Sequence, residues 1–165
     1  MIYANHTLFF GLIISAIIGL QSCKTTDEIP AEKPTESISE STSFPIKTIS
    51  EGYLAGNEKE GIGEGGLVIN SQADWDALVT KMNSVNDAIE EQSIDFNELT
   101  VLAFFDQMIG SGGYAVDIVS VVKDGNKLVA NVQKTVPKED QIEIMTQPFM
   151  IGFINKTDLP VIFLD

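Results

Sequence analysis

The chain contains one cysteine, Cys23, one histidine, His6, and no arginine. Everything after residue 23 therefore lacks an imidazole general base, a thiol nucleophile and the usual side-chain ligands of zinc. It also has no disulfide framework and no bidentate guanidinium clamp for phosphate or carboxylate. We accordingly expect no enzyme, no catalytic residues, no metal and no cofactor, although chemistry based on Asp, Glu, Lys, Ser or Tyr stays open.

Positive charge is also scarce. The chain has 24 acidic residues against 10 lysines and a formal net charge of −14, and none of these charges lies within residues 1–22. Such a surface repels phosphate backbones and anionic lipid headgroups. The composition argues against a nucleic-acid partner.

The N-terminal segment carries the one long apolar run, from Leu8 to Leu20. Thirteen helical residues reach roughly 20 Å, which is short of the ~30 Å hydrocarbon core. That length is typical of the apolar region of a secretory signal. Residues 1–22 are therefore predicted to be a signal peptide.

The signal ends in Leu20-Gln21-Ser22-Cys23, which resembles the bacterial lipobox. The resemblance implies a lipid anchor on Cys23 and a lipoprotein of the bacterial cell envelope. It departs from the pattern in the bulk of Gln21 and in an N-terminal region without lysine. Lys24 stands where an inner-membrane retention signal would have Asp, so we expect the outer membrane, on its periplasmic or surface face. Two alternatives are an ordinary cleaved signal with an incidental cysteine and an uncleaved anchor.

Residues 23–43 are rich in Ser, Thr, Glu, Pro and Lys and have little to bury. We expect them to form a lipid-anchored, disordered tether, because such a segment cannot offset the entropy of backbone ordering. Residues 44–165 are then a single globular domain.

The domain is predicted to be β-rich α+β, an antiparallel sheet or sandwich of about six to seven strands with one main helix at about 71–83. Ser71 begins a capping box, and apolar residues follow at helical spacing from Trp75 to Met82. Leu99–Phe105 is expected to be a central strand buried on both faces. The other expected strands are 44–54, 67–69, 114–122, 126–136, 149–154 and 161–164.

The hairpin around Asp124-Gly125 has a predicted register. A two-residue Asp124-Gly125 loop would mix the apolar faces of the two strands. A three-residue loop, Lys123 to Gly125, places Val116 and Ile118 on the same face as Leu128. We therefore predict the three-residue loop.

Two motifs are interpreted as structural. The segment 61–66 formally contains G-x-G-x-x-G, but an expected strand follows it, whereas a dinucleotide site requires a helix there. Asp74 and Asp76 are two residues apart and so do not share a helix face, which argues against a catalytic dyad.

The sharpest local feature is the glycine loop before the fourth expected strand. Ser111, Gly112, Gly113 and Tyr114 are the candidate protein-binding residues, with Tyr114 as base or anchor of a loop that contacts a partner. No histidine exists to activate Ser111. Free glycine amides could alternatively form an anion nest, or the loop could be a plain turn whose tyrosine fills the core.

Two stretches resemble the C-terminal domain of the PrcB protease-complex subunit. They are Gly112–Ile118 (GGYAVDI) and Thr146–Phe149 (TQPF), and the similar region covers about residues 104–156. That family typically has T-G-G-Y-x-V-x-I, a hairpin, a proline and T-x-P-Y. This chain has Ser111 and Phe149 where threonine and tyrosine are usual. The resemblance implies a lipoprotein that binds or stabilises a secreted protease complex, without catalytic residues.

We therefore expect a membrane-anchored, non-catalytic module that binds an envelope or secreted protein complex, such as a protease complex. One rival is an enzyme or small-ligand-binding protein that uses acidic residues such as Asp106 and Asp117. Another is a protease-inhibitor-like module that uses the 109–114 loop, which resembles the glycine-rich wedges of chagasin-like inhibitors. A third is a structural envelope protein with no discrete site. The sequence predicts neither the partner nor the oligomeric state.

Overall fold

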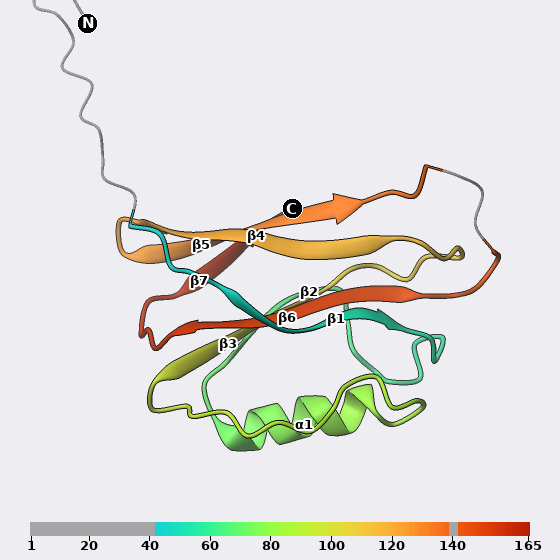
Figure 1. The fold of residues 1–165 in the computed structure, drawn as a ribbon, viewed down its shortest axis with the longest axis horizontal. Helices are drawn as coiled ribbons and strands as arrows, with labels where there is room; N and C mark the ends of the chain where they lie inside the picture. Colours follow the sequence, from blue (N-terminus) through green and yellow to red (C-terminus); the bar gives the residue numbers. More distant parts are fainter. Residues whose placement is uncertain (1–41, 139–141) are drawn as a thin grey trace, which may run out of the picture. The chain divides into compact units, whose positions relative to one another are not determined.

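A computed structural model describes residues 42–138 and 142–165. In this part the chain forms three layers, with one helix and two sheets (Figure 1). The β-rich α+β class, the seven strands and the main helix that the sequence predicts are confirmed. The elements are β1 (Lys47–Leu54), β2 (Gly65–Ile69), α1 (Gln72–Met82), β3 (Leu99–Phe105), β4 (Ala115–Asp124), β5 (Lys127–Thr135), β6 (Gln147–Asn155) and β7 (Val161–Leu164).

The strands form a sandwich. One sheet has four antiparallel strands in the order β1-β6-β3-β2, and the other has three in the order β4-β5-β7. β7 pairs with β5 in parallel, a pairing that the sequence analysis did not predict. β2 begins at Gly65, within the segment 61–66, so the glycines lead into a strand, as expected for a structural glycine turn.

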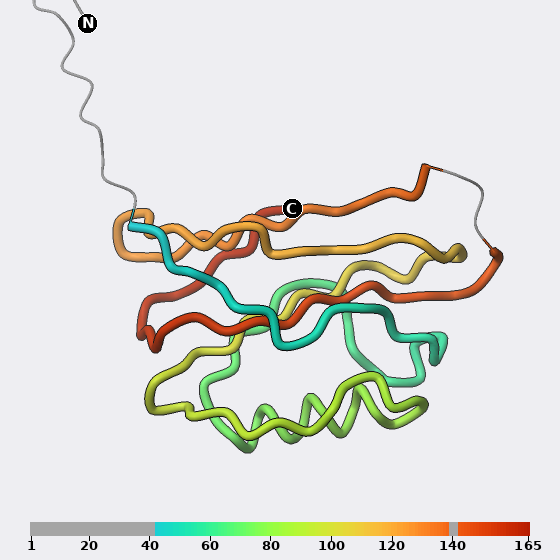
Figure 2. Tube along the Cα trace, in the orientation of Figure 1, coloured from blue at the N-terminus to red at the C-terminus, as the bar shows by residue number. Residues whose placement is uncertain are grey.

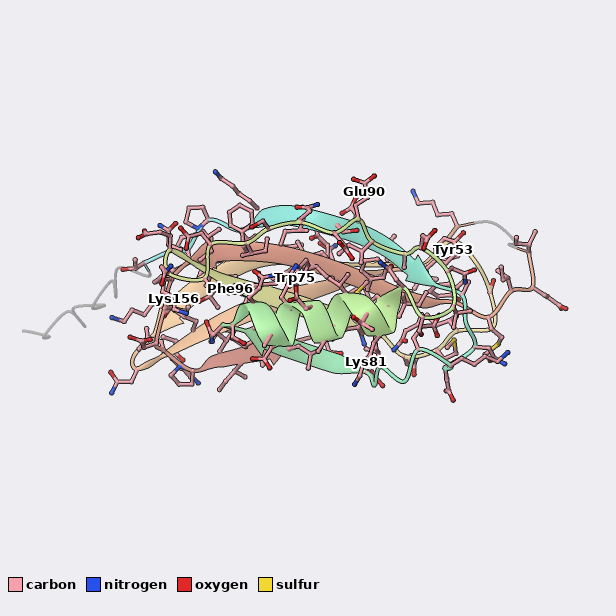
Figure 3. The ribbon with its side chains drawn as sticks, turned by 90° about the horizontal axis from the view of Figure 1, so that it is seen from below. Tyr53, Trp75, Lys81, Glu90, Phe96 and Lys156 are labelled. Atoms are coloured by element: carbon pink, nitrogen blue, oxygen red, sulfur yellow. The ribbon has the colours of Figure 1, made fainter. Side chains whose placement is uncertain are left out.

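α1 covers the outer face of the four-stranded sheet (Figure 3). It begins after Ser71, whose hydroxyl accepts the Asp74 amide at 3.2 Å, and it buries one face that includes Trp75 and Met82. The segment between α1 and β3 then runs back along the helix (Figure 2). It is attached by Ile89, which is buried in the core under α1, and by the Trp75 indole N–H, which donates to the Gln92 carbonyl at 3.0 Å. The Asn83 side chain accepts two further amides from this segment, at residues 88 and 89.

β3 and β6 lie in the middle of the sheet and are buried on both faces. Phe105 in β3 and Ile151 in β6 pack into the core between the sheet and α1. Leu102 in β3 and Met150 in β6 pack into the second core, between the two sheets. Because side chains alternate along a strand, a continuous apolar run such as β3 supplies both cores at once.

The β4–β5 hairpin corrects one prediction. Asp124 pairs with Lys127, so the loop has two residues, Gly125-Asn126, and not three. Gly125 adopts φ +60°, as the first residue of such a turn requires. A two-residue loop was expected to mix the apolar faces of the two strands. A bulge between Ile118 and Ser120 prevents this, because it returns the apolar residues of both strands to one face.

The described structure begins slightly before the expected domain boundary. The amides of Phe44 and Lys123 donate to Val121 and Thr42 carbonyls, so residues assigned to the tether pair with β4. Backbone pairing needs no apolar side chain, which is why composition gave no sign of it. The chain then crosses to the other sheet over Gly152, where an added Cβ would lie 2.9 Å from Ile46 Cγ1.

The predicted signal peptide, Cys23 and residues 24–41 of the tether lie outside the described residues. Within the residues that are described, no helix has the length and apolar character needed to cross a membrane.

Lys134 joins the two sheets through charge. Its ammonium lies 2.9 Å from Asp106 Oδ1 after β3, 2.7 Å from Asp165 Oδ2 after β7 and 3.8 Å from Glu64 Oε1 before β2. Asp106 is buried, so this ammonium compensates a carboxylate that water barely reaches. The hydrogen bonds to Asp165 and Asp106 raise the pKa of Lys134 above its usual value, and the same ammonium lowers the pKa of Asp165.

Replacing Lys134 with methionine should lower the free energy of unfolding by about 1–3 kcal/mol, because the buried Asp106 carboxylate would lose its counter-charge. Urea titration measures this. Lys127→Met is the matched control, since among the described residues Lys127 pairs only with the exposed Asp124, and its effect should stay within about 0.5 kcal/mol. Equal effects of the two substitutions would show that Lys134 does not hold the sheets together.

The ion pairs of Lys134 should also make the free energy of unfolding depend on pH. The pKa of Asp165 is lowered, so its contribution is present above its ordinary value of 3.8 and is lost as the pH falls through the folded value. The pKa of Lys134 is raised, so its contribution is present below 10.5 and is lost as the pH rises through the folded value. The stability difference between the unmodified chain and Asp165→Asn should therefore be flat at intermediate pH and shrink at both extremes, as thermal melts across pH would show. A difference that persists in strong acid would contradict this.

Candidate protein-binding surface at the glycine loop

The glycine loop is the segment 106–114 between β3 and β4, and it is paired with the segment 142–146 that leads into β6. Ile109 and Thr146 exchange both backbone hydrogen bonds, each at 2.8 Å. The Gly112 amide donates to the Ile142 carbonyl at 3.2 Å, and the Thr146 hydroxyl donates to the Ser111 carbonyl at 3.0 Å. The loop thus continues the β3–β6 ladder beyond the sheet, and it is fixed by that pairing.

The four predicted binding residues differ in exposure. Gly113 is exposed and adopts φ +79°, a left-handed conformation that favours glycine. Ser111 and Tyr114 are half-buried, and Gly112 is buried. Because the Gly112 amide is bonded to Ile142, it does not form part of a free anion nest.

Gln147 ties this loop to the turn that precedes β2. Its side-chain amide donates to the Asp106 carbonyl at 3.0 Å and to the Ile62 carbonyl at 3.2 Å, and Gln147 itself is buried. A cavity of about 540 Å³ lies along this junction, lined by residues that include Gly63 and Met108. Two glycine-rich segments that are far apart in sequence therefore meet at one end of the sandwich.

The side chains that the sequence analysis missed lie on the facing segment. Ile142, Ile144 and Met145 are exposed by 73%, 37% and 41%. They border the glycine loop, since a Cβ built on Gly112 would lie 3.5 Å from Ile144 and one on Gly110 would lie 3.6 Å from Met145. The alternation of isoleucine and glutamate over 142–144 is a signal in the sequence, because strand-like alternation predicts an extended segment before Thr146. We call these three side chains, together with residues 109–114, the glycine-loop surface.

The acidic residues of the rival hypothesis are not brought together. Asp106 is buried, and its carboxylate accepts the Gln107 amide and pairs with Lys134. Asp117 is exposed and lies on β4 opposite Gln133. In the described part of the chain the two carboxylates share no hydrogen bond or ion pair, so the geometry gives them no joint acid–base role.

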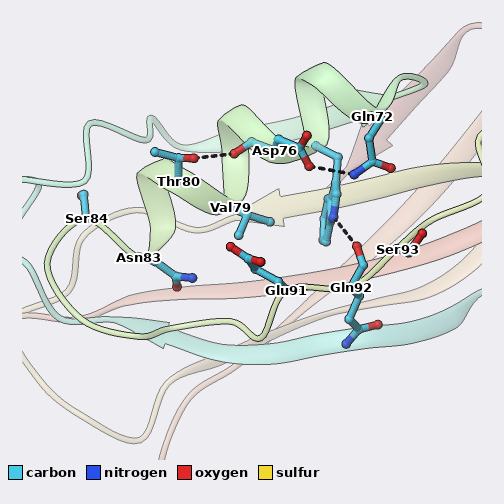
Figure 4. Close-up of a pocket in the computed structure, with 10 residues that line it drawn as sticks. Gln72, Asp76, Val79, Thr80, Asn83, Ser84, Glu91, Gln92 and Ser93 are labelled. Carbon is cyan, nitrogen blue, oxygen red and sulfur yellow. Dashed lines mark hydrogen bonds between the residues drawn. The ribbon is translucent and has the colours of Figure 1, made fainter.

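A second feature is the groove between α1 and the segment 84–95, with a volume of about 860 Å³ (Figure 4). Two of its polar side chains are bonded to Asp76: Gln72 donates to the carboxylate at 2.7 Å, and Thr80 donates to the backbone carbonyl at 2.7 Å. Asp76 and Glu91 line the groove, but across residues 42–138 and 142–165 no group of three or more Asp, Glu, His or Cys residues is placed to hold a metal ion. The groove is the space between the helix and the segment that runs back along it.

Comparison of the chain with protein-family models, with curated proteins and with solved structures gave no match.

The conformation of the glycine loop gives a matched pair of substitutions. Gly113→Ala should cost about 1–2 kcal/mol, because alanine is strained in the left-handed region. Gly112→Ala should cost far less, since the new methyl group would meet Ile144 and Ile142 at ordinary contact distances. Urea titration of both variants tests this, and a larger loss for Gly112→Ala would show that the loop is held differently.

Proposed function

We propose that this domain is a membrane-tethered, non-catalytic module that binds a protein partner through the glycine-loop surface. The observation that carries the proposal is the group of three large apolar side chains, Ile142, Ile144 and Met145, exposed beside a loop fixed by hydrogen bonds. Complete burial of one such side chain by a partner contributes about 1.5–3 kcal/mol. A rigid apolar group of this kind is typical of the centre of an interface, because little ordering entropy is lost on binding.

The chemistry of the surface favours binding over catalysis. Ser111 has no histidine to activate it anywhere in the exported part of the chain. The carboxylate of Asp106, the first residue of the loop, is paired with Lys134. Of the four exposed residues on the facing segment, three are large and apolar and one is Glu143, a composition that suits contact with a protein surface.

Location and partner follow from the sequence. The lipobox-like residues 20–23 support a lipid on Cys23 and attachment to the cell envelope, at the outer membrane. The resemblance of residues 104–156 to the PrcB C-terminal domain supports a partner that is an envelope or secreted protein complex, such as a protease complex. The net charge of −14 supports a partner other than nucleic acid.

Site-specific photo-crosslinking in cells of the native host tests the proposal. A photoreactive phenylalanine analogue at Ile142 should give a discrete protein adduct, and the double substitution Ile144→Ser with Met145→Ser should remove it. The same analogue at Val119 is the control, because this side chain is equally apolar and is 50% exposed on β4. Equal adducts at both positions, or none at Ile142, would contradict the assigned surface.

The anchor is read out in the same cells. Cys23→Ser should abolish incorporation of a labelled fatty acid into the chain, because the acyl chains would have no thiol to attach to. Incorporation that persists in the variant would show that the cysteine is not the anchor.

A further inference from the structure

Glu60 is a buried carboxylate that the proposed binding surface does not use. It lies in the turn that joins β1 to β2, and the residue is only 4% exposed. Its Oε2 atom is buried and has no hydrogen-bond partner among the described residues. None of the ion pairs in residues 42–138 and 142–165 includes it. Burial of an ionised carboxylate is costly unless a donor or a cation compensates it, so this position calls for a partner group.

The turn itself holds the carboxylate inward. Asn57 and Glu58 both adopt left-handed conformations, with φ +54° and +67°, which are unusual for residues other than glycine. The carboxylate packs directly against Gly56, where any Cβ would overlap it. The local backbone is therefore arranged so that Glu60 points into the domain although its neighbours in sequence are exposed.

Glu60 forms part of the wall of a cavity of about 400 Å³. Two more carboxylates line the cavity, Glu51 from β1 and Asp87 from the segment that follows α1. Two aromatic rings line it as well. Phe149 is buried, and Tyr53 is 55% exposed near the end of β1 (Figure 3). No lysine lines the cavity.

This combination has the character of a site for an organic cation. Three carboxylates with no opposing lysine give the cavity a negative potential. Aromatic rings attract an ammonium group through their faces. A divalent metal ion would need several carboxylates converging on one point, and the described residues contain no such group.

We propose that this cavity binds an alkylammonium group of the lysine side-chain type, with Glu60 as its counter-charge and Tyr53 at the entrance. The site is separate from the glycine-loop surface, and it stands whether or not that surface binds a protein. The same chemistry could be supplied by a free amine or by a lysine side chain of a polypeptide.

Calorimetric titration of the full-length chain in detergent micelles tests the proposal. The probes are Nα-acetyl-lysine methylamide, its Nε-acetylated form, which lacks the charge, and n-butylamine. The lysine derivative should bind and its Nε-acetylated form should not. Glu60→Gln should weaken binding about tenfold or more, because it removes the counter-charge but keeps the shape. Glu98→Gln, at an exposed position outside the cavity, should bind like the unmodified chain.

The outcomes separate the sources of the amine. Comparable binding of n-butylamine would indicate a free amine, and clear preference for the lysine derivative would indicate a polypeptide side chain. Glu60→Gln should melt at or above the temperature of the unmodified chain, since it relieves a buried charge. Asp87→Asn at the exposed rim is a second variant with little risk of misfolding, and it should weaken binding several-fold. Absence of binding up to about 10 mM, equal binding of the Nε-acetylated form, or full binding by Glu60→Gln would each overturn the proposal.

Discussion

The structure depends on the burial of β3 and β6 on both faces. These two strands supply apolar side chains alternately to the core beneath α1 and to the core between the sheets. Neither core is complete without them, and neither strand can slip by one residue without exchanging every side chain between the two cores. The register of the domain, and with it the position of everything that extends from these strands, is fixed by that constraint.

The glycine-loop surface is the direct extension of the same two strands. Residues 106–114 follow β3 and residues 142–146 precede β6, and they continue the pairing of the two strands past their ends. Gln147, the first residue of β6, then fastens the turn before β2 to the loop. The surface is thus held by the most deeply buried part of the domain, although it consists of irregular backbone. Such support is what lets a short loop keep one shape without a disulfide.

Local patterns in the sequence predicted the elements well, and distant interactions account for what was missed. Three local patterns predicted the element in which they lie, and all three are confirmed: the capping residue Ser71, the helical spacing from Trp75 and the apolar run 99–105. The hairpin loop was predicted wrongly because a bulge at Val119 corrects the parity, and nothing local to the turn reveals it. The parallel β5–β7 pair depends on topology, which spacing alone does not determine.

For the site, glycines marked the loop in the sequence, but the apolar side chains across from it are brought near only by the β3–β6 register. Glu60 gave no signal at all, because its burial results from two left-handed residues that no composition rule predicts.

The strand order has a consequence for the way the chain reaches its folded state. β1 pairs with β6, so the first strand of the larger sheet cannot pair until a segment roughly a hundred residues further along the chain is present. β3, in the middle of that sheet, also needs β6 on one side. A polypeptide threaded through a narrow translocation channel from its N-terminus therefore could not complete either hydrophobic core until nearly all of it had passed. Strand order alone thus defers the folding of both cores until the C-terminal third of the chain is present to pair.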